Sequence, residues 1–70
     1  MNWDQIQGKW EQYKGAAREQ WGELTDNELQ EAKGDREQLI GKIQERYGKT
    51  REDAEAEVVK WQNSVLEKHA

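Results

Sequence analysis

Apolar side chains recur every three or four residues over most of the chain, which is the spacing of one face of an α-helix. The first run of such positions comprises Trp3, Ile6, Trp10, Tyr13, Ala17, Trp21 and Leu24. Asn2 stands where an N-cap is expected, and Gly22 stands where a helix commonly ends. The pattern predicts one long amphipathic helix over residues 3–21.

The same spacing continues through the rest of the chain and predicts three further helices, over residues 26–33, 35–47 and 51–67, with residues 68–70 frayed. Thr25 and Glu28 match the capping box that opens a helix, and Thr50 is the expected N-cap of the last helix. Gly34 and Gly48 are expected to end the second and third helices. The inward-facing positions are Leu29, Ala32, Leu39, Ile40, Ile43, Tyr47, Ala54, Val58, Trp61 and Val65, with Val59 and Leu66 widening the last stripe.

A weak internal repeat relates the two halves of the chain at an offset of 26 residues. It matches the glycines Gly8, Gly15 and Gly22 to Gly34, Gly41 and Gly48. Shared helical composition explains part of the match. The repeat and the helix lengths predict an all-α fold, a single domain over residues 1–70 that forms a small four-helix bundle of two helical hairpins. One core is expected to contain Trp10, Tyr13, Trp21, Leu39, Ile43, Tyr47, Val58 and Trp61.

Three glycines, Gly8, Gly15 and Gly41, lie inside predicted helices. Each costs about 0.8–1 kcal/mol relative to alanine in a helix interior. A domain of this size has a total stability of about 3.5–10 kcal/mol, so the combined cost is large. Two explanations stay open: helix backbones cross closely at these glycines, or the chain is selected to be loosely folded and strongly hydrated.

The composition makes the core thin. Hydrophobic residues make up 33% of the chain and charged residues 37%, and the mean hydropathy is −1.38, close to that of disordered chains. The four tryptophans and two tyrosines supply the buried area that folding needs. Cysteine is absent, and neither a signal peptide nor an apolar span of membrane length is apparent. We therefore expect a cytoplasmic monomer without membrane association.

Side chains that catalysis or metal binding requires are scarce. His69 is the only histidine and lies next to the C-terminal residue, and Ser64 is the only serine. No nucleophile with a base, no phosphate-binding loop and no cluster of metal-ligating residues can be assembled. We expect no enzymatic activity, no catalytic residue, no metal and no cofactor.

Positive charge gathers in one segment. Between residues 36 and 51 five bases stand against two acids: Arg36, Lys42, Arg46, Lys49 and Arg51 are the candidate contacts to phosphate or nucleic acid. The turn at residues 47–50 also resembles part of a helix-hairpin-helix motif, although its second glycine is missing. The net charge of −4 and the acids that follow the segment oppose such binding. Nucleic-acid binding is therefore expected to be weak or absent, and ion pairs within the chain are the alternative role of these bases.

Three longer motifs can be compared with known families. They are Gly8-Lys9-Trp10 with Lys14-Gly15, then Trp21-Gly22-Glu23-Leu24-Thr25-Asp26, and Leu39-Ile40-Gly41-Lys42-Ile43-Gln44-Glu45-Arg46-Tyr47-Gly48. Together they closely resemble the CsbD-like family of small bacterial stress proteins, over about residues 2–61. The resemblance implies a bacterial cytoplasmic protein made under general stress, with two hairpins packed across each other. It carries over no catalytic residue, cofactor or ligand, because the family's molecular activity is unsettled.

Three functions are compatible with these features. Glycine content and hydrophilicity are similar to those of hydrophilins, which suggests a non-enzymatic protectant that keeps a hydrated charged surface and offers a few amphipathic helix faces to protein clients. The first alternative is a binding module for one specific protein partner. The second is weak nucleic-acid association through residues 36–51.

Overall fold

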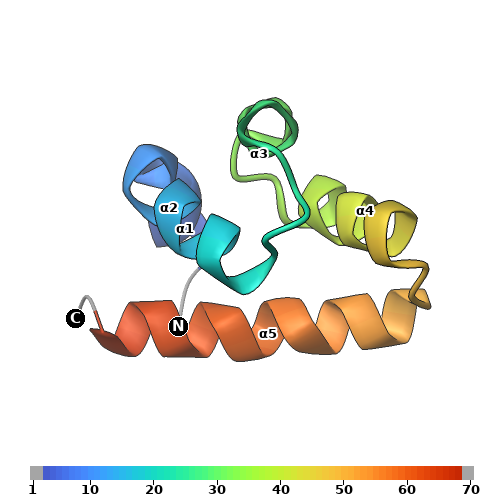
Figure 1. Cartoon of the computed structure of the whole chain (residues 1–70). Helices are drawn as coiled ribbons and strands as arrows, with labels where there is room; N and C mark the ends of the chain where they lie inside the picture. Colours follow the sequence, from blue (N-terminus) through green and yellow to red (C-terminus); the bar gives the residue numbers. More distant parts are fainter. Residues whose placement is uncertain (1–2, 69–70) are drawn as a thin grey trace.

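The computed structural model describes residues 3–68 (Figure 1). Five helices form in this range: α1 (Trp3–Gly8), α2 (Trp10–Gln20), α3 (Asp26–Ala32), α4 (Arg36–Tyr47) and α5 (Arg51–Lys68). No strand forms between residues 3 and 68, so the all-α fold class is confirmed. Helix α5 includes Lys68, so the prediction of fraying at position 68 is wrong. The expected cap at Asn2, the tail residue His69 and the other positions expected to fray, 69–70, lie outside the described residues.

The first predicted helix is divided at Lys9, so the prediction of one continuous helix over residues 3–21 is wrong. Lys9 has φ −121° and ψ 35°, outside the α-helical region, and its side chain supplies no cap to α2. Its amide contacts both the Gln5 and the Ile6 carbonyl oxygens, at 3.2 and 3.3 Å. Gly8 directly precedes the break, and glycine is a weak helix former. The break divides the predicted helix into α1 and α2.

The helices pack in contact with their chain neighbours but are not aligned as a bundle. Helix α5 lies along one side of the molecule, and both α1 and α2 contact it, as does α4. Helix α3 contacts α2 and α4 and is seen nearly end-on in Figure 1, whereas α5 lies in the plane of the view. The pairs α2–α3 and α4–α5 keep the contacts of two hairpins. The specific four-helix bundle is not confirmed, because α3 crosses the other elements.

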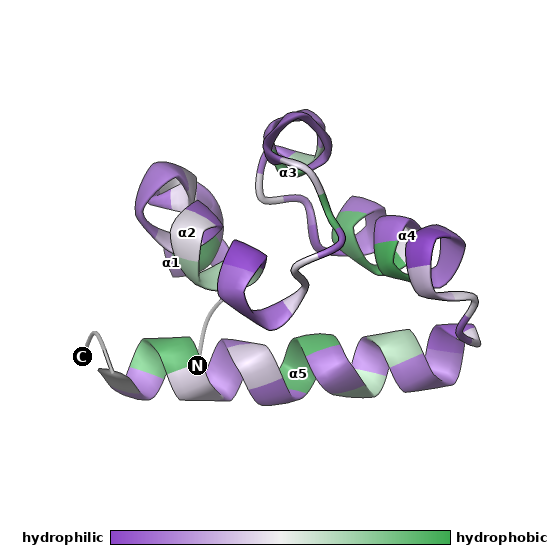
Figure 2. Ribbon diagram, in the orientation of Figure 1, coloured by the Kyte–Doolittle hydropathy of each residue, from purple (hydrophilic) through white to green (hydrophobic). Residues whose placement is uncertain are grey.

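One hydrophobic cluster fills the space between the helices. Its buried members are Ile6, Trp10, Tyr13, Ala17, Trp21, Leu24, Leu29, Leu39, Ile40, Ile43, Ala54, Val58, Trp61 and Val65. In Figure 2 hydrophobic residues alternate with hydrophilic ones along α4 and α5, as expected for helices with one buried face. The core prediction is confirmed except at Tyr47, which is only half-buried at the edge of the cluster.

Two smaller side-chain predictions have different outcomes. Leu66 is half-buried against the cluster, as expected of a residue that widens the apolar stripe of α5. Val59 is 39% exposed, so its assignment to that stripe is wrong. Val58 is the residue that enters the core, and the next position on a helix points about 100° away from it.

The helix ends follow the sequence closely. Thr25 Oγ1 accepts a hydrogen bond from the Glu28 amide at 3.1 Å, and the Glu28 carboxylate accepts one from the Thr25 amide at 3.0 Å, which completes the predicted capping box. Thr50 Oγ1 accepts from the Asp53 amide at 3.1 Å. Gly48 ends α4 in the left-handed region at φ 64°. These ends position the α2–α3 and α4–α5 turns.

The interior glycines do not mark close helix crossings. A Cβ atom placed on Gly8, Gly15 or Gly41 would find no other atom within 4 Å beyond its own helix and chain neighbours. The close-crossing explanation is therefore wrong for these three positions. Gly34 is different, since a Cβ there would lie 2.9 Å from the Cα atom of Gln7, and its φ is 78°. Close backbone approach therefore occurs where α1 meets the α3–α4 turn.

Candidate functional site

The five candidate basic residues each form an ion pair with a carboxylate from another element. The pairs are Arg36–Glu55 at 3.5 Å, Lys42–Glu31 at 3.0 Å, Arg46–Glu28 at 2.7 Å, Arg51–Glu37 at 2.6 Å, and Lys49–Glu57. The segment thus connects α4 and the following turn to α3 and α5. Because each base has an acid beside it, the segment presents little uncompensated positive charge to a phosphate.

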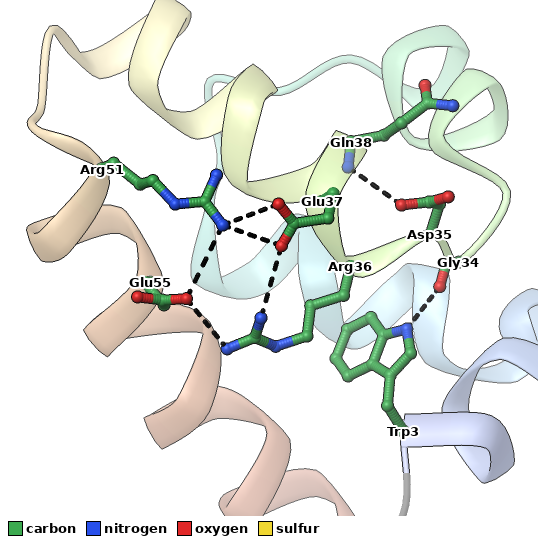
Figure 3. Close-up of polar contacts among 8 residues, drawn as sticks. All are labelled: Trp3, Gly34, Asp35, Arg36, Glu37, Gln38, Arg51 and Glu55. Atoms are coloured by element: carbon green, nitrogen blue, oxygen red, sulfur yellow. Dashed lines mark hydrogen bonds and ion pairs between the residues drawn. The ribbon is translucent and has the colours of Figure 1, made fainter.

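At the start of α4 and α5 four charges alternate in sign (Figure 3). Arg51 Nη2 donates to both oxygens of Glu37, at 2.6 and 2.8 Å, which raises the pKa of the Arg51 guanidinium. Arg36 lies 3.6 Å from Glu37 and 3.5 Å from Glu55, and Arg51 lies 3.8 Å from Glu55. Two cations and two anions cancel, so this cluster links the helices without attracting an ion.

A second link joins α3 to α4. The Arg46 guanidinium, together with the Thr25 amide, lowers the pKa of Glu28 from 4.5 to about 2. The Glu28 carboxylate therefore serves both the capping box of α3 and the ion pair with α4. Lys42 and Glu31 form a parallel pair between the same two helices. These two ion pairs of α4 side chains therefore fix α3 against α4.

Glu57 is a polar residue whose role the sequence reasoning missed. Its carboxylate accepts a hydrogen bond from Trp21 Nε1 at 2.9 Å and another from Lys49, and the Lys49 ammonium, more than the indole, lowers the pKa of Glu57. Lys49 also lies 5.3 Å from the centroid of the Tyr47 ring. In sequence Glu57 is one of several acids of α5. Its position four residues before Trp61, at the border of the apolar stripe, is the signal that could have found it.

The four tryptophans form a cluster centred on Trp61. Its ring centroid lies 6.1 Å from that of Trp3, 6.4 Å from that of Trp10 and 5.4 Å from that of Trp21. The indole nitrogens of Trp3 and Trp10 donate to the carbonyl oxygens of Gly34 and Leu29, at 2.5 and 2.9 Å. Among the buried side-chain nitrogen and oxygen atoms of residues 3–68, only Trp61 Nε1 lacks a hydrogen-bond partner. Such an orphaned donor is costly and requires an explanation.

The described residues offer little other chemistry. In residues 3–68 no group of three or more histidine, cysteine, aspartate or glutamate side chains is placed to hold a metal ion. No helix in that range is long and apolar enough to cross a membrane. Ser64 is exposed on α5 and lines a surface hollow with Gln20, Glu57, Lys60 and Trp61. These residues provide no histidine or other base paired with the serine hydroxyl.

Comparison with known proteins identifies the family. The CsbD-like family model matches residues 4–56. UPF0337 protein ECA0631 of Pectobacterium atrosepticum is 56% identical over 63 residues, which cover 90% of this chain and 91% of that protein. UPF0337 protein YjbJ of Escherichia coli K12 is 53% identical over 62 residues, covering 89% and 90%. UPF0337 protein pc0632 of Protochlamydia amoebophila is 54% identical over 57 residues, covering 81% and 86%. These names state no molecular activity, but the match over most of the sequence confirms the resemblance seen in the motifs, and the chain belongs to the CsbD-like family.

Proposed function

We propose that this protein is a non-enzymatic stress-response protein that protects other proteins in the bacterial cytoplasm when water becomes scarce. The observation that carries the proposal is its surface. Within residues 3–68 Val59 is the only large hydrophobic side chain classed as exposed, and it is 39% exposed. A surface this polar retains water and does not promote aggregation with the molecules around it.

The charge arrangement supports the same function. Acids and bases are interleaved as ion pairs across α3, α4 and α5, so no large field of one sign selects one kind of partner. A protectant must tolerate many neighbours, and contacts with mixed charge are weak and reversible. The interior glycines support a loosely held chain, because open space surrounds Gly15 and Gly41 and packing does not require them.

The amphipathic faces expected to serve clients are closed in this structure. The apolar residues of α2, α4 and α5 pack against one another in a single cluster. Protection by the closed protein therefore rests on hydration and on polar contacts at its surface. Contact with an apolar client segment requires that part of the cluster be uncovered.

A drying assay tests the proposal. A labile enzyme is dried or frozen with near-stoichiometric amounts of this protein, and its recovered activity is compared with that after treatment with an equal mass of an inert globular protein. We expect higher recovery with this protein because its polar surface keeps water and reversible polar contacts beside the enzyme. Recovery equal to that of the inert protein would refute the proposal. Capture of a single saturable partner from stressed cells, with no weak clients, would also contradict it and favour a specific binding module.

A further inference from the structure

We propose that α1 is a detachable strap, covering a site on α5 that binds amphipathic helical segments of partly unfolded proteins. This inference rests on the proposed protective function and names the surface through which a client would be held. The strap is defined as Trp3–Gly8, and the site beneath it is centred on Trp61.

A break in helical geometry divides the strap from α2, and backbone hydrogen bonds from the Lys9 amide to the Gln5 and Ile6 carbonyl oxygens span that break. Lys9 interrupts the helix between α1 and α2, and Gly8 precedes the interruption. A helix of six residues does not persist in water on its own, because nucleation is unfavourable at this length. The strap is therefore helical only while it is docked, and its release costs the docking contacts and the exposure of the core surface that Ile6 covers.

Several of those docking contacts can be identified individually. Ile6 is fully buried, and the Trp3 ring packs against Trp61 while remaining partly exposed. Trp3 Nε1 donates to the Gly34 carbonyl oxygen at 2.5 Å, as Figure 3 shows. Gln7 lies against Gly34 so closely that a Cβ atom at Gly34 would come within 2.9 Å of the Gln7 Cα atom. Two apolar anchors, one side-chain hydrogen bond and the packing of Gln7 against Gly34 are therefore among the contacts that hold the strap.

The site beneath the strap has the character of a binding hot spot. Trp61 is a large aromatic side chain that is 95% buried when α1 is docked, since its exposed fraction is 5%. Its Nε1 donor has no partner among residues 3–68, and contact with water or with a carbonyl oxygen of a client would satisfy it. Undocking of α1 uncovers the face of Trp61 that Trp3 covers.

The strap itself indicates what the site accepts. It presents Trp3 and Ile6, three residues apart on one helix face, while Asp4, Gln5 and Gln7 are exposed. A client helix with large apolar side chains at positions i and i+3 and polar residues elsewhere would make the same contacts. Partly unfolded proteins expose such segments during water loss. Client and strap compete for one site, so the apparent affinity is reduced by the fraction of molecules in which the strap is docked.

The test uses the full chain and a fluorescein-labelled helical peptide in which tryptophan and isoleucine, three residues apart, are the only large apolar side chains. Trp3→Phe keeps an aromatic ring but removes the hydrogen bond to Gly34, and Gly34→Ala displaces Gln7. We expect each variant to bind the peptide at least about fivefold more tightly than the parent protein does, since loss of one neutral hydrogen bond changes an equilibrium by about that factor. Fluorescence anisotropy measures the peptide affinity. In Trp3→Phe, hydrogen exchange of the α1 amides should accelerate by a similar factor while exchange in α4 is unchanged.

Thr25→Ala is the matched control, because it removes a helix cap of comparable worth at the start of α3, away from the strap. Its peptide affinity should equal that of the parent protein. Equal affinity of the parent and Trp3→Phe would overturn the inference, as would an equal gain in Thr25→Ala, which would indicate global unfolding. Formation of a dimer by the strap variants, seen by sedimentation, would assign the site to α1 of a second copy and also overturn it. Peptide binding as expected, with no protection by the parent protein in the drying assay, would leave the site in place and refute only the protective function.

Discussion

Replacement of Gly15 by alanine should stabilise this protein. Gly15 lies inside α2 and is exposed, and beyond its own helix backbone and chain neighbours no atom lies within 4 Å of the place where a Cβ would be added. Alanine is favoured over glycine in a helix interior by about 0.8–1 kcal/mol, and no packing cost offsets that gain. For a domain of this size 1 kcal/mol corresponds to a rise in Tm of about 4–8 °C. Gly41→Ala in α4 has the same open surroundings and should give a similar rise.

Two other glycines serve as opposite controls. Gly48 has φ 64° with open space around it, so Gly48→Ala should cost about 1 kcal/mol from backbone strain alone. Gly34 has φ 78° and also lies against Gln7, so Gly34→Ala should be more destabilising than Gly48→Ala. Urea melts at constant m-value measure all four differences. A loss of stability in Gly15→Ala, or a gain in Gly34→Ala, would show that the argument from local space and backbone angle is wrong.

Three further results are expected. The pKa of Glu28 is held near 2 in the folded protein, against 4.5 ordinarily, so the unfolded chain binds the proton at a higher pH than the folded protein does. The free energy of unfolding should therefore fall as the pH drops from about 4.5 to about 2. In denaturant melts Glu28→Gln should reduce this dependence of the unfolding free energy on pH. An unchanged dependence would contradict the assignment of the fall to Glu28. Lys33 ends α3 in the left-handed region at φ 53°, so Lys33→Gly should raise the unfolding free energy by about 0.5–1 kcal/mol, and a loss would refute that reasoning. Binding to duplex or single-stranded nucleic acid should be weak or absent at physiological salt, and submicromolar binding that Lys42→Gln and Arg46→Gln weaken in a salt titration would contradict this.

The features that sequence predicted well are those set by residues close in the chain. The capping box of Thr25 and Glu28 depends on two residues three positions apart, and it is present as predicted. The buried stripe of α5 follows from helical spacing, which places Ala54, Val58 and Trp61 on one face. Such patterns are satisfied locally, so tertiary packing preserves them.

The features that sequence missed depend on residues far apart. The apolar spacing of Trp3, Ile6 and Trp10 continues across Lys9, and nothing in it signals that α1 turns to meet Gly34. The basic segment was recognised as a cluster of charge, but its carboxylate partners come from α3, from the start of α4 and from α5. Their identity follows only from how those helices cross. Whether a glycine serves packing likewise depends on its spatial neighbours.

The structure separates two properties that composition alone confuses, namely a hydrated surface and a loosely held fold. Gly15 and Gly41 raise the free energy of the folded helices without adding or removing a contact on the surface. The ion pairs and exposed polar side chains set the surface and do not depend on these glycines. A Gly15→Ala/Gly41→Ala variant therefore keeps the hydrated surface and loses the looseness. If hydration of the folded protein protects clients, that variant should preserve enzyme activity on drying as well as the parent protein does. If global loosening is required, its protection should decrease, whereas the strap at α1 should open as before because neither glycine contacts it.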